Sequence, residues 1–146
     1  MNREHIPGII IGKLMNIGGM LQRQGNKMLL PFNLNQQQFS IFFEIAKAGK
    51  VKQKEMVNRL LLEKAHVSKV VKKLQQMDLI TVTENEEDKR SYWLSVTKKG
   101  EKLLKQCREI FSEWHKDWIC EIDETELPSI LDHLTILQSI FREKTR

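Results

Sequence analysis

Residues 53–97 carry the pattern that decides the fold: QKEMVNRLLLEKAHVSKVVKKLQQMDLI (53–80), followed by TVTENEEDKRSYWLSVT (81–97). The first stretch contains two runs of apolar residues at helical spacing, separated by a short break. The second contains two alternating runs, rich in β-branched and aromatic residues, on either side of a charged tip. Helix, turn, basic helix and hairpin follow one another in the order of a winged helix-turn-helix.

The second helical run, from Lys64 to Met77, is the most informative part of this stretch. A period of 3.6 residues gathers one apolar stripe on its inner face: Val67, Val70, Val71, Leu74 and Met77. Its remaining surface carries small, polar and basic residues: Lys64, Ala65, His66, Ser68, Lys69, Lys72 and Lys73. Small residues let a helix enter the major groove of DNA, lysines reach phosphates, and Ser and His hydrogen-bond base edges. We therefore predict that this surface contacts DNA; the alternative is an ordinary surface helix with a solvated lysine face.

The preceding helix is predicted to run from about Lys52 to Leu61 and to bury four side chains: Met56, Val57, Leu60 and Leu61. Leu61, Leu62 and Glu63 then form the turn, with Glu63 as a weak N-cap for the basic helix. The hairpin strands are predicted around Ile80–Thr83 and Tyr92–Val96, joined by a polar, exposed loop over 84–91.

The tip of this hairpin combines four acidic residues with Lys89 and Arg90. We predict that both basic residues bind DNA, and that the Asp88 carboxylate holds the Arg90 guanidinium in a fixed pose. The alternative is a plain surface hairpin with an exposed ion pair, which contributes little.

Five pieces of the chain, in order and at plausible spacing, resemble the MarR family, the multiple-antibiotic-resistance regulators of bacteria and archaea. LNQQQF (34–39) resembles the opening of the family's second helix, and residues 53–80 resemble its helix-turn-helix. DKRS (88–91) is similar to its wing signature, and LSVTKKG (94–100) to its strand-to-helix junction. DETEL (123–127) resembles the start of its last helix.

The resemblance implies a dimer that binds DNA and responds to a small, often aromatic, anionic effector held between the dimerisation helices and the DNA-binding lobe. Three positions depart from the family's pattern. Leu61 and Asp78 stand where the family often has glycine, in the turn and at the end of the basic helix. Thr83 replaces a common basic residue, which removes one phosphate contact.

The flanking segments are apolar at helical spacing. Residues 9–30 contain four glycines, each costing about 1 kcal/mol against alanine in a helix interior, so packing must hold this helix. Pro31 ends it, and Asn35 then caps a helix whose predicted buried side includes three aromatic residues: Phe39, Phe42 and Phe43.

After the hairpin, Thr97 is predicted to cap a helix that extends through Trp118. Asp123 and Glu126 predict a capping-box-like start for the last helix, which carries an apolar stripe from Leu127 to Phe141. Three amphipathic helices outside a small module have more apolar surface than the module covers. We therefore expect a two-fold dimer, which would read a pseudo-palindromic site with half-sites about one DNA turn apart.

Charge is distributed unevenly along the 146 residues, whose formal net charge is +5. Residues 50–80 contain eight Lys/Arg and three Asp/Glu, whereas residues 107–146 contain five Lys/Arg and nine Asp/Glu. The basic region indicates a nucleic-acid partner, and the acidic end is unsuited to one. No apolar run has the length of a membrane span, and the N-terminus lacks the features of a signal peptide. A cytoplasmic protein without a membrane partner is expected, in a bacterium or an archaeon.

No motif for catalysis or cofactor binding is found. Cys107 and Cys120 form no Cys-x-x-Cys pair and are expected to be reduced and to pack within helices. The four histidines are scattered, and no ligand spacing requires a metal. Trp114 and Trp118, one helical turn apart, are expected in the core or a dimer interface rather than in a ligand cage.

The predicted fold is mainly α with a small β-hairpin wing (α+β): a winged helix-turn-helix over 35–99, with dimerisation helices mainly in 1–33 and 101–146 of a single domain, 1–146. The predicted function is that of a homodimeric, sequence-specific DNA-binding transcriptional regulator, a repressor released by a small-molecule effector, without enzymatic activity or cofactor. The alternative is a winged-helix module that has lost DNA binding and docks on a protein, as the acidic wing and Thr83 would favour. An enzyme is a third and weakly supported class.

Overall fold

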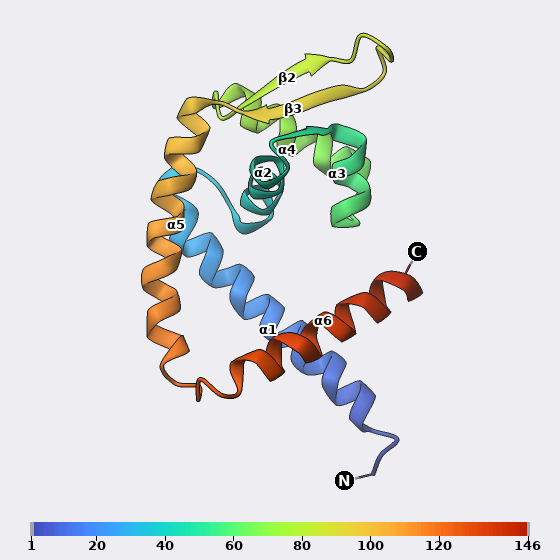
Figure 1. Ribbon diagram of the computed structural model, residues 1–146, viewed down its shortest axis with the longest axis vertical. Coiled ribbons are helices and arrows are strands. Elements are labelled where there is room, and N and C mark those ends of the chain that lie inside the picture. Colours follow the sequence, from blue (N-terminus) through green and yellow to red (C-terminus); the bar gives the residue numbers. More distant parts are fainter. Residues whose placement is uncertain (1, 146) are drawn as a thin grey trace. The chain divides into compact units, whose positions relative to one another are not determined.

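A computed structural model describes residues 2–145 (Figure 1). The chain divides into one compact unit up to Arg108 and a second from Glu109. The elements follow in the order α1 (Ile6–Leu29), a 3₁₀ helix η1 (Leu30–Phe32), α2 (Gln36–Ala48), β1 (Lys50–Lys52), α3 (Gln53–Leu60), α4 (Lys64–Gln76), β2 (Ile80–Glu84), β3 (Tyr92–Val96), α5 (Lys98–Ile119) and α6 (Leu127–Lys144). This confirms the predicted fold class, a mainly helical protein with a β-hairpin wing.

The core of the first unit lies between α2, α4 and the sheet. Helix α4 buries four of the five residues of the predicted stripe, and Val67 and Leu74 are fully enclosed. The fifth, Met77, lies just past the end of the helix and is partly exposed. Helix α2 contributes a face made by Ile41, Phe42 and Ile45. The prediction for Phe43 was wrong: its side chain is 40% exposed and stacks on Phe39, with ring centroids 6.1 Å apart.

The sheet contains three antiparallel strands in the order β1-β3-β2, one more than the sequence predicted. In its register Val51 pairs with Leu94, and Val82 pairs with the same residue from the other side. Val51 and Leu94 face the core, whereas Trp93 lies on the opposite face below the ammonium groups of Lys50 and Lys52, at 4.8 and 5.2 Å from its ring centroid. In Figure 1 the β2–β3 hairpin extends beyond the helices of its unit as the predicted wing.

Both positions where the family favours glycine adopt left-handed backbone. Leu61 ends α3 at φ 53°, and Asp78 follows α4 at φ 61°. A Cβ makes this conformation unfavourable, which explains the preference for glycine. The prediction that Leu61 is buried was wrong, because the left-handed turn leaves its side chain 54% exposed.

The first turn of α5 is tied to the segment between α4 and β2. As predicted, Thr97 caps the helix: its hydroxyl accepts from the Gly100 N–H at 3.0 Å. The same hydroxyl donates to the Asp78 carbonyl at 2.6 Å, and the Thr97 N–H donates to the Leu79 carbonyl at 3.1 Å. A Cβ at Gly100 would collide with the Leu79 carbonyl oxygen, so only glycine permits this approach.

Two further predicted caps had different outcomes. Asn35 and Gln38 form a full capping box at the start of α2, with side-chain-to-backbone hydrogen bonds of 2.8 and 3.0 Å. The capping box predicted for α6 was wrong. Asp123 instead accepts the backbone N–H and the hydroxyl of Thr125, which lower the pKa of its carboxyl, and Glu126 makes no side-chain cap.

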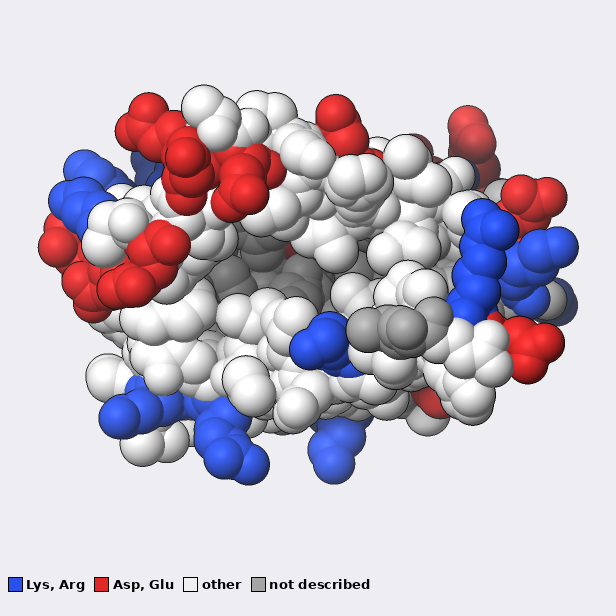
Figure 2. All heavy atoms as spheres, turned by 90° about the horizontal axis from the view of Figure 1, so that it is seen from below, with Lys and Arg blue, Asp and Glu red and all other residues white. Residues whose placement is uncertain are grey.

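Helices α1 and α6 leave most of their apolar side chains exposed. Along α1, Met15 is 74% and Met20 62% exposed, and only Gly25 and Leu29 are buried. Helix α6 buries no residue, and Leu131 is 66% exposed. Figure 2 shows a face with wide areas of uncharged side chains, whereas acidic and basic groups lie mainly near the edges of the view.

The two cysteines differ in environment. Cys107 is fully buried, as predicted for a packing residue, and burial raises the pKa of its thiol to about 11. Cys120 is exposed, so the same prediction was wrong for it; its thiol donates to the Asp117 carbonyl at 3.1 Å. No helix among residues 2–145 is long and apolar enough to cross a membrane.

Candidate nucleic-acid interface

The outer face of α4 presents the basic surface that the sequence predicted. Lys64, Ala65, Lys69 and Lys72 are exposed, and Ser68 is partly exposed beside them. The buried valines fix the rotation of the helix, so these side chains are held away from the core by its packing. The helix begins after Glu63, which makes no side-chain cap, so the first N–H groups of α4 remain available to other acceptors.

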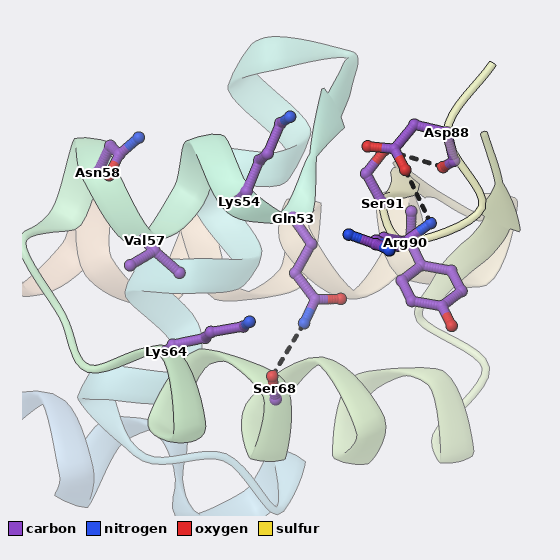
Figure 3. A pocket seen from close by; sticks show the side chains of 10 residues that line it. Gln53, Lys54, Val57, Asn58, Lys64, Ser68, Asp88, Arg90 and Ser91 are labelled. Carbon is purple, nitrogen blue, oxygen red and sulfur yellow. Dashed lines mark hydrogen bonds between the residues drawn. The ribbon is translucent and has the colours of Figure 1, made fainter.

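An open hollow of about 510 Å³ lies between α3, α4 and the wing (Figure 3). Its lining brings together residues from all three elements: Gln53, Lys54, Val57, Asn58, Lys64, Ser68, Asp88, Arg90, Ser91 and Tyr92. Lys64 and Ser68 of the predicted set therefore share one concave surface with Arg90, although the wing is more than twenty residues away in sequence. Lys89 is exposed in the wing but does not line this hollow.

Two lining residues, Gln53 and Lys54, had no role in the sequence-based set. They start α3, and Figure 3 shows both side chains extending from that helix near the hollow. The Gln53 carboxamide crosses to α4, where its Nε2 donates to Ser68 Oγ at 3.1 Å. Neither residue belongs to an apolar stripe, so periodicity gave no signal for them.

The predicted ion pair in the wing is replaced by a turn. The Asp88 carboxylate accepts the backbone N–H of Arg90 at 3.0 Å, and no ion pair between this carboxylate and the Arg90 guanidinium is present among residues 2–145. An aspartate at this place in a tight turn bonds to the backbone two residues on, which occupies its oxygen and leaves the arginine side chain free to extend. In Figure 3 the guanidinium of Arg90 is directed toward the side of the hollow where Gln53 lies.

A polar pair closes the base of the wing. Asn85 and Ser91 are buried, which corrects the prediction of an exposed loop throughout 84–91. The Asn85 amide donates to Ser91 Oγ at 3.2 Å, and its backbone N–H donates to the Ser91 carbonyl at 3.1 Å. Buried polar groups need such partners, and here these bonds join the two arms of the wing.

Lys73 and His66 lie differently from the other predicted contacts. The Lys73 ammonium donates to the Asn33 carbonyl at 2.7 Å and to Gln38 Oε1 at 3.0 Å, so it joins α4 to the start of α2. His66 is partly buried, and its Nε2 is enclosed without a hydrogen-bond partner. Neither residue lines the hollow. Across residues 2–145, no group of three or more His, Cys, Asp or Glu could hold a metal ion.

Comparison with known proteins agrees with this geometry. Residues 34–92 match the model of the MarR family. The HTH-type transcriptional regulator BilQ of Clostridioides difficile is 27% identical over 114 residues, covering 78% of this chain and 77% of that protein. BilQ of Clostridium symbiosum is 28% identical over 100 residues, covering 68% of this chain and 67% of that protein.

Solved structures share the fold. The transcriptional regulator BldR from Sulfolobus solfataricus superposes with a TM-score of 0.85 at 18% identity, covering 95% of this chain and 99% of that one. A mutant MarR from E. coli, complexed with operator DNA, gives a TM-score of 0.78 at 18% identity, covering 94% of this chain and 99% of that one. The family match coincides with the helix-turn-helix and the first part of the wing. Residues 34–92 of the chain thus match the MarR family, and the chain as a whole has the winged-helix fold of the solved MarR structures.

Proposed function

We propose that this chain is a homodimeric, sequence-specific regulator that represses transcription and is released from DNA by a small-molecule effector. The observation that carries the DNA-binding part is the hollow between α3, α4 and the wing. It places Lys64 and Ser68 of α4 on one concave surface with Arg90. A helix that enters the major groove beside a wing at the minor groove needs such an arrangement.

The charges support a nucleic-acid partner. Lys64, Lys69 and Lys72 are exposed along α4, and Lys54 adds a further cation at the start of α3. Phosphate contacts of this kind supply most of the affinity, whereas contacts with base edges supply the specificity. We assign these lysines to phosphates, Ala65 and Ser68 to base edges, and Arg90 to the minor groove. Lys89 would bind a phosphate near the wing.

The proposed dimer rests on the exposed apolar surface. Large apolar side chains such as Met20 and Leu131 are more than half exposed on α1 and α6. Each of these helices therefore has an exposed apolar stripe, and such stripes mark protein interfaces. A second copy of the chain is the occupant that also explains how one short helix achieves specificity, since two symmetric helices read two half-sites.

The dimer is tested by a charge on α6. Leu131→Glu should shift sedimentation from dimer toward monomer or aggregate, because a carboxylate would be buried in the interface. Ser139→Glu introduces the same charge where the helical spacing places it away from the apolar stripe, and should leave the dimer intact. A wild-type protein that sediments as a monomer at micromolar concentration would refute this part of the proposal.

Release by an effector is proposed from the family. Such a ligand acts only if it binds one spacing of the two α4 helices of the dimer better than another. Benzoate and related aromatic carboxylates are the first probes, tested by their effect on the melting temperature and on bound DNA. The protein is proposed to act in the cytoplasm, where its DNA lies.

The acidic wing favours a second candidate function, a module that docks on a protein partner. Glu84, Glu86, Glu87 and Asp88 are all exposed and would repel phosphates. One experiment separates the candidates: DNA fragments from the source genome are incubated with the purified protein, and the bound fragments are sequenced. Recovery of a shared pseudo-palindrome, with binding that weakens as salt rises, supports the regulator. Recovery of no enriched sequence supports the docking module.

A further inference from the structure

Gln53 lines both hollows of the candidate interface, although it starts α3 rather than α4. Its Nε2 donates to Ser68 Oγ at 3.1 Å. Both residues border the main hollow and a second one of about 370 Å³, lined also by Lys72, Gln75 and Tyr92. The pair therefore forms the ridge between two hollows on the surface proposed to meet DNA.

This hydrogen bond determines what the pair offers to a ligand. Ser68 Oγ accepts the hydrogen bond from Gln53 Nε2. The hydrogen of the Ser68 hydroxyl is therefore available for donation to another group. The Gln53 Oε1 atom accepts from none of the described residues, and Figure 3 shows it turned toward the wing side of the hollow. The two side chains thus present one donor beside one acceptor.

Only one base matches this pattern in the major groove. Adenine carries the N7 acceptor next to the N6 donor, guanine carries two acceptors, thymine an acceptor and a methyl group, and cytosine a single donor. We propose that Gln53 and Ser68 together read one adenine in each half-site, with Gln53 Oε1 accepting from N6 and Ser68 Oγ donating to N7. This inference rests on the proposed function and adds Gln53 as a specificity-determining residue.

The test uses the full-length protein and altered bases. A pool of random DNA duplexes is selected on the wild type, and each adenine of the selected duplex is replaced in turn. The replacements are 7-deazaadenine, which lacks the N7 acceptor, and purine, which lacks the 6-amino group. At one adenine per half-site, each replacement should weaken wild-type binding about fivefold or more, since a net hydrogen bond contributes about 1 kcal/mol.

The two protein variants should respond to different atoms of that adenine. Gln53→Ala should lose its sensitivity to purine, because the acceptor for N6 is absent. Ser68→Ala should lose its sensitivity to 7-deazaadenine, because the donor to N7 is absent. Gln37→Ala removes an exposed glutamine of α2 outside both hollows and should respond to both replacements as wild type does.

A conservative variant guards against a folding effect. Gln53→Glu keeps the side-chain shape but presents acceptors only, so the preferred base at this position should change from adenine to cytosine. Circular dichroism and melting temperature confirm that each variant is folded.

The outcomes separate the inference from the proposed function. A wild type that enriches no sequence overturns both. A wild type that selects an operator, with Gln53→Ala and Gln53→Glu variants that keep its preferences at every position, overturns the inference alone.

Discussion

The ammonium group of Lys73 lies 2.7 Å from the carbonyl oxygen of Asn33, forty residues earlier in the chain. Asn33 has left-handed backbone at the end of η1, and Gln38, the second acceptor of Lys73, belongs to the capping box of α2. The lysine therefore fastens α4 to the start of α2, where the chain leaves α1. It has a structural role that the sequence could not distinguish from a phosphate contact.

Lys73→Ala should lower the free energy of unfolding by about 1–2 kcal/mol, because hydrogen bonds from a charged group contribute about that much. Urea unfolding measures the change. The salt dependence of DNA binding should keep its wild-type slope, since the ammonium is engaged within the protein. A shallower slope in this variant would show instead that Lys73 contacts a phosphate.

Lys72→Ala provides the opposite case. The Lys72 side chain is exposed and lines the second hollow, so its loss should change stability little. For the wild-type dimer, the plot of log K against log salt should be steeper than about −3, because each neutralised phosphate adds about −0.9. The variant should bind more weakly with a shallower slope, measured by fluorescence anisotropy. A wild-type slope near zero would contradict the DNA-binding function.

The wing turn predicts a difference between two substitutions of Asp88. Asp88→Asn keeps an oxygen that accepts the Arg90 N–H, so DNA binding should be retained or slightly improved by the lost negative charge. Asp88→Ala removes the acceptor and should weaken binding by loosening the turn. Arg90→Ala should weaken binding to many sequences alike, as expected of a minor-groove contact. Equal losses for Asn and Ala would show that the carboxylate charge, rather than the turn, is what matters.

Leu61→Gly should stabilise the protein. The residue is 54% exposed at φ 53°, so little apolar burial is lost while a backbone strain of roughly 1–2 kcal/mol is relieved. The cost of glycine in the unfolded chain offsets part of this, leaving a gain of about 0.5 kcal/mol. Asn58→Gly, an exposed position within α3, serves as the control and should lower stability by roughly 0.3 kcal/mol, since asparagine is itself a poor helix former. Thermal unfolding compares the two; a destabilised Leu61 variant would show that the turn is not strained.

The buried thiol of Cys107 predicts a loss of stability at high pH. Burial raises its pKa from 9.0 to about 11. The unfolded chain therefore releases this proton at a lower pH than the folded chain does. Stability should be unaffected below pH 9 and should fall as pH rises from about 9 to 11. Urea midpoints across this range should decline less in Cys107→Ala than in Cys120→Ala, whose thiol is exposed in the wild type. Identical declines would exclude the buried thiol as the cause.

The sequence predicted those elements whose pattern is local. The valine stripe of α4 specifies both the helix and its rotation, and Asn35 and Thr97 mark helix starts through their short polar side chains. Such features depend on residues within a few positions of one another.

Features that depend on distant partners could not be predicted. Strand β1 has only three residues, and its identity comes from pairing with β3, more than forty residues later. The aromatic spacing in α2 suggested a face that includes Phe43, but Ile41 and Ile45 determine which side is buried. The contact of Gln53 with Ser68 likewise requires the packing of α3 on α4.

The joint between Thr97, Asp78 and Leu79 has a mechanical consequence. Because Thr97 holds both carbonyls and Gly100 leaves no space beside them, the first turn of α5 cannot pivot freely against the end of α4. A displacement of the first turns of α5 would therefore move α4 and the wing together with it. Replacing Gly100 with alanine would place a methyl group against the Leu79 carbonyl oxygen and separate the two segments. Movement of α5 would then no longer be transmitted to α4 and the wing.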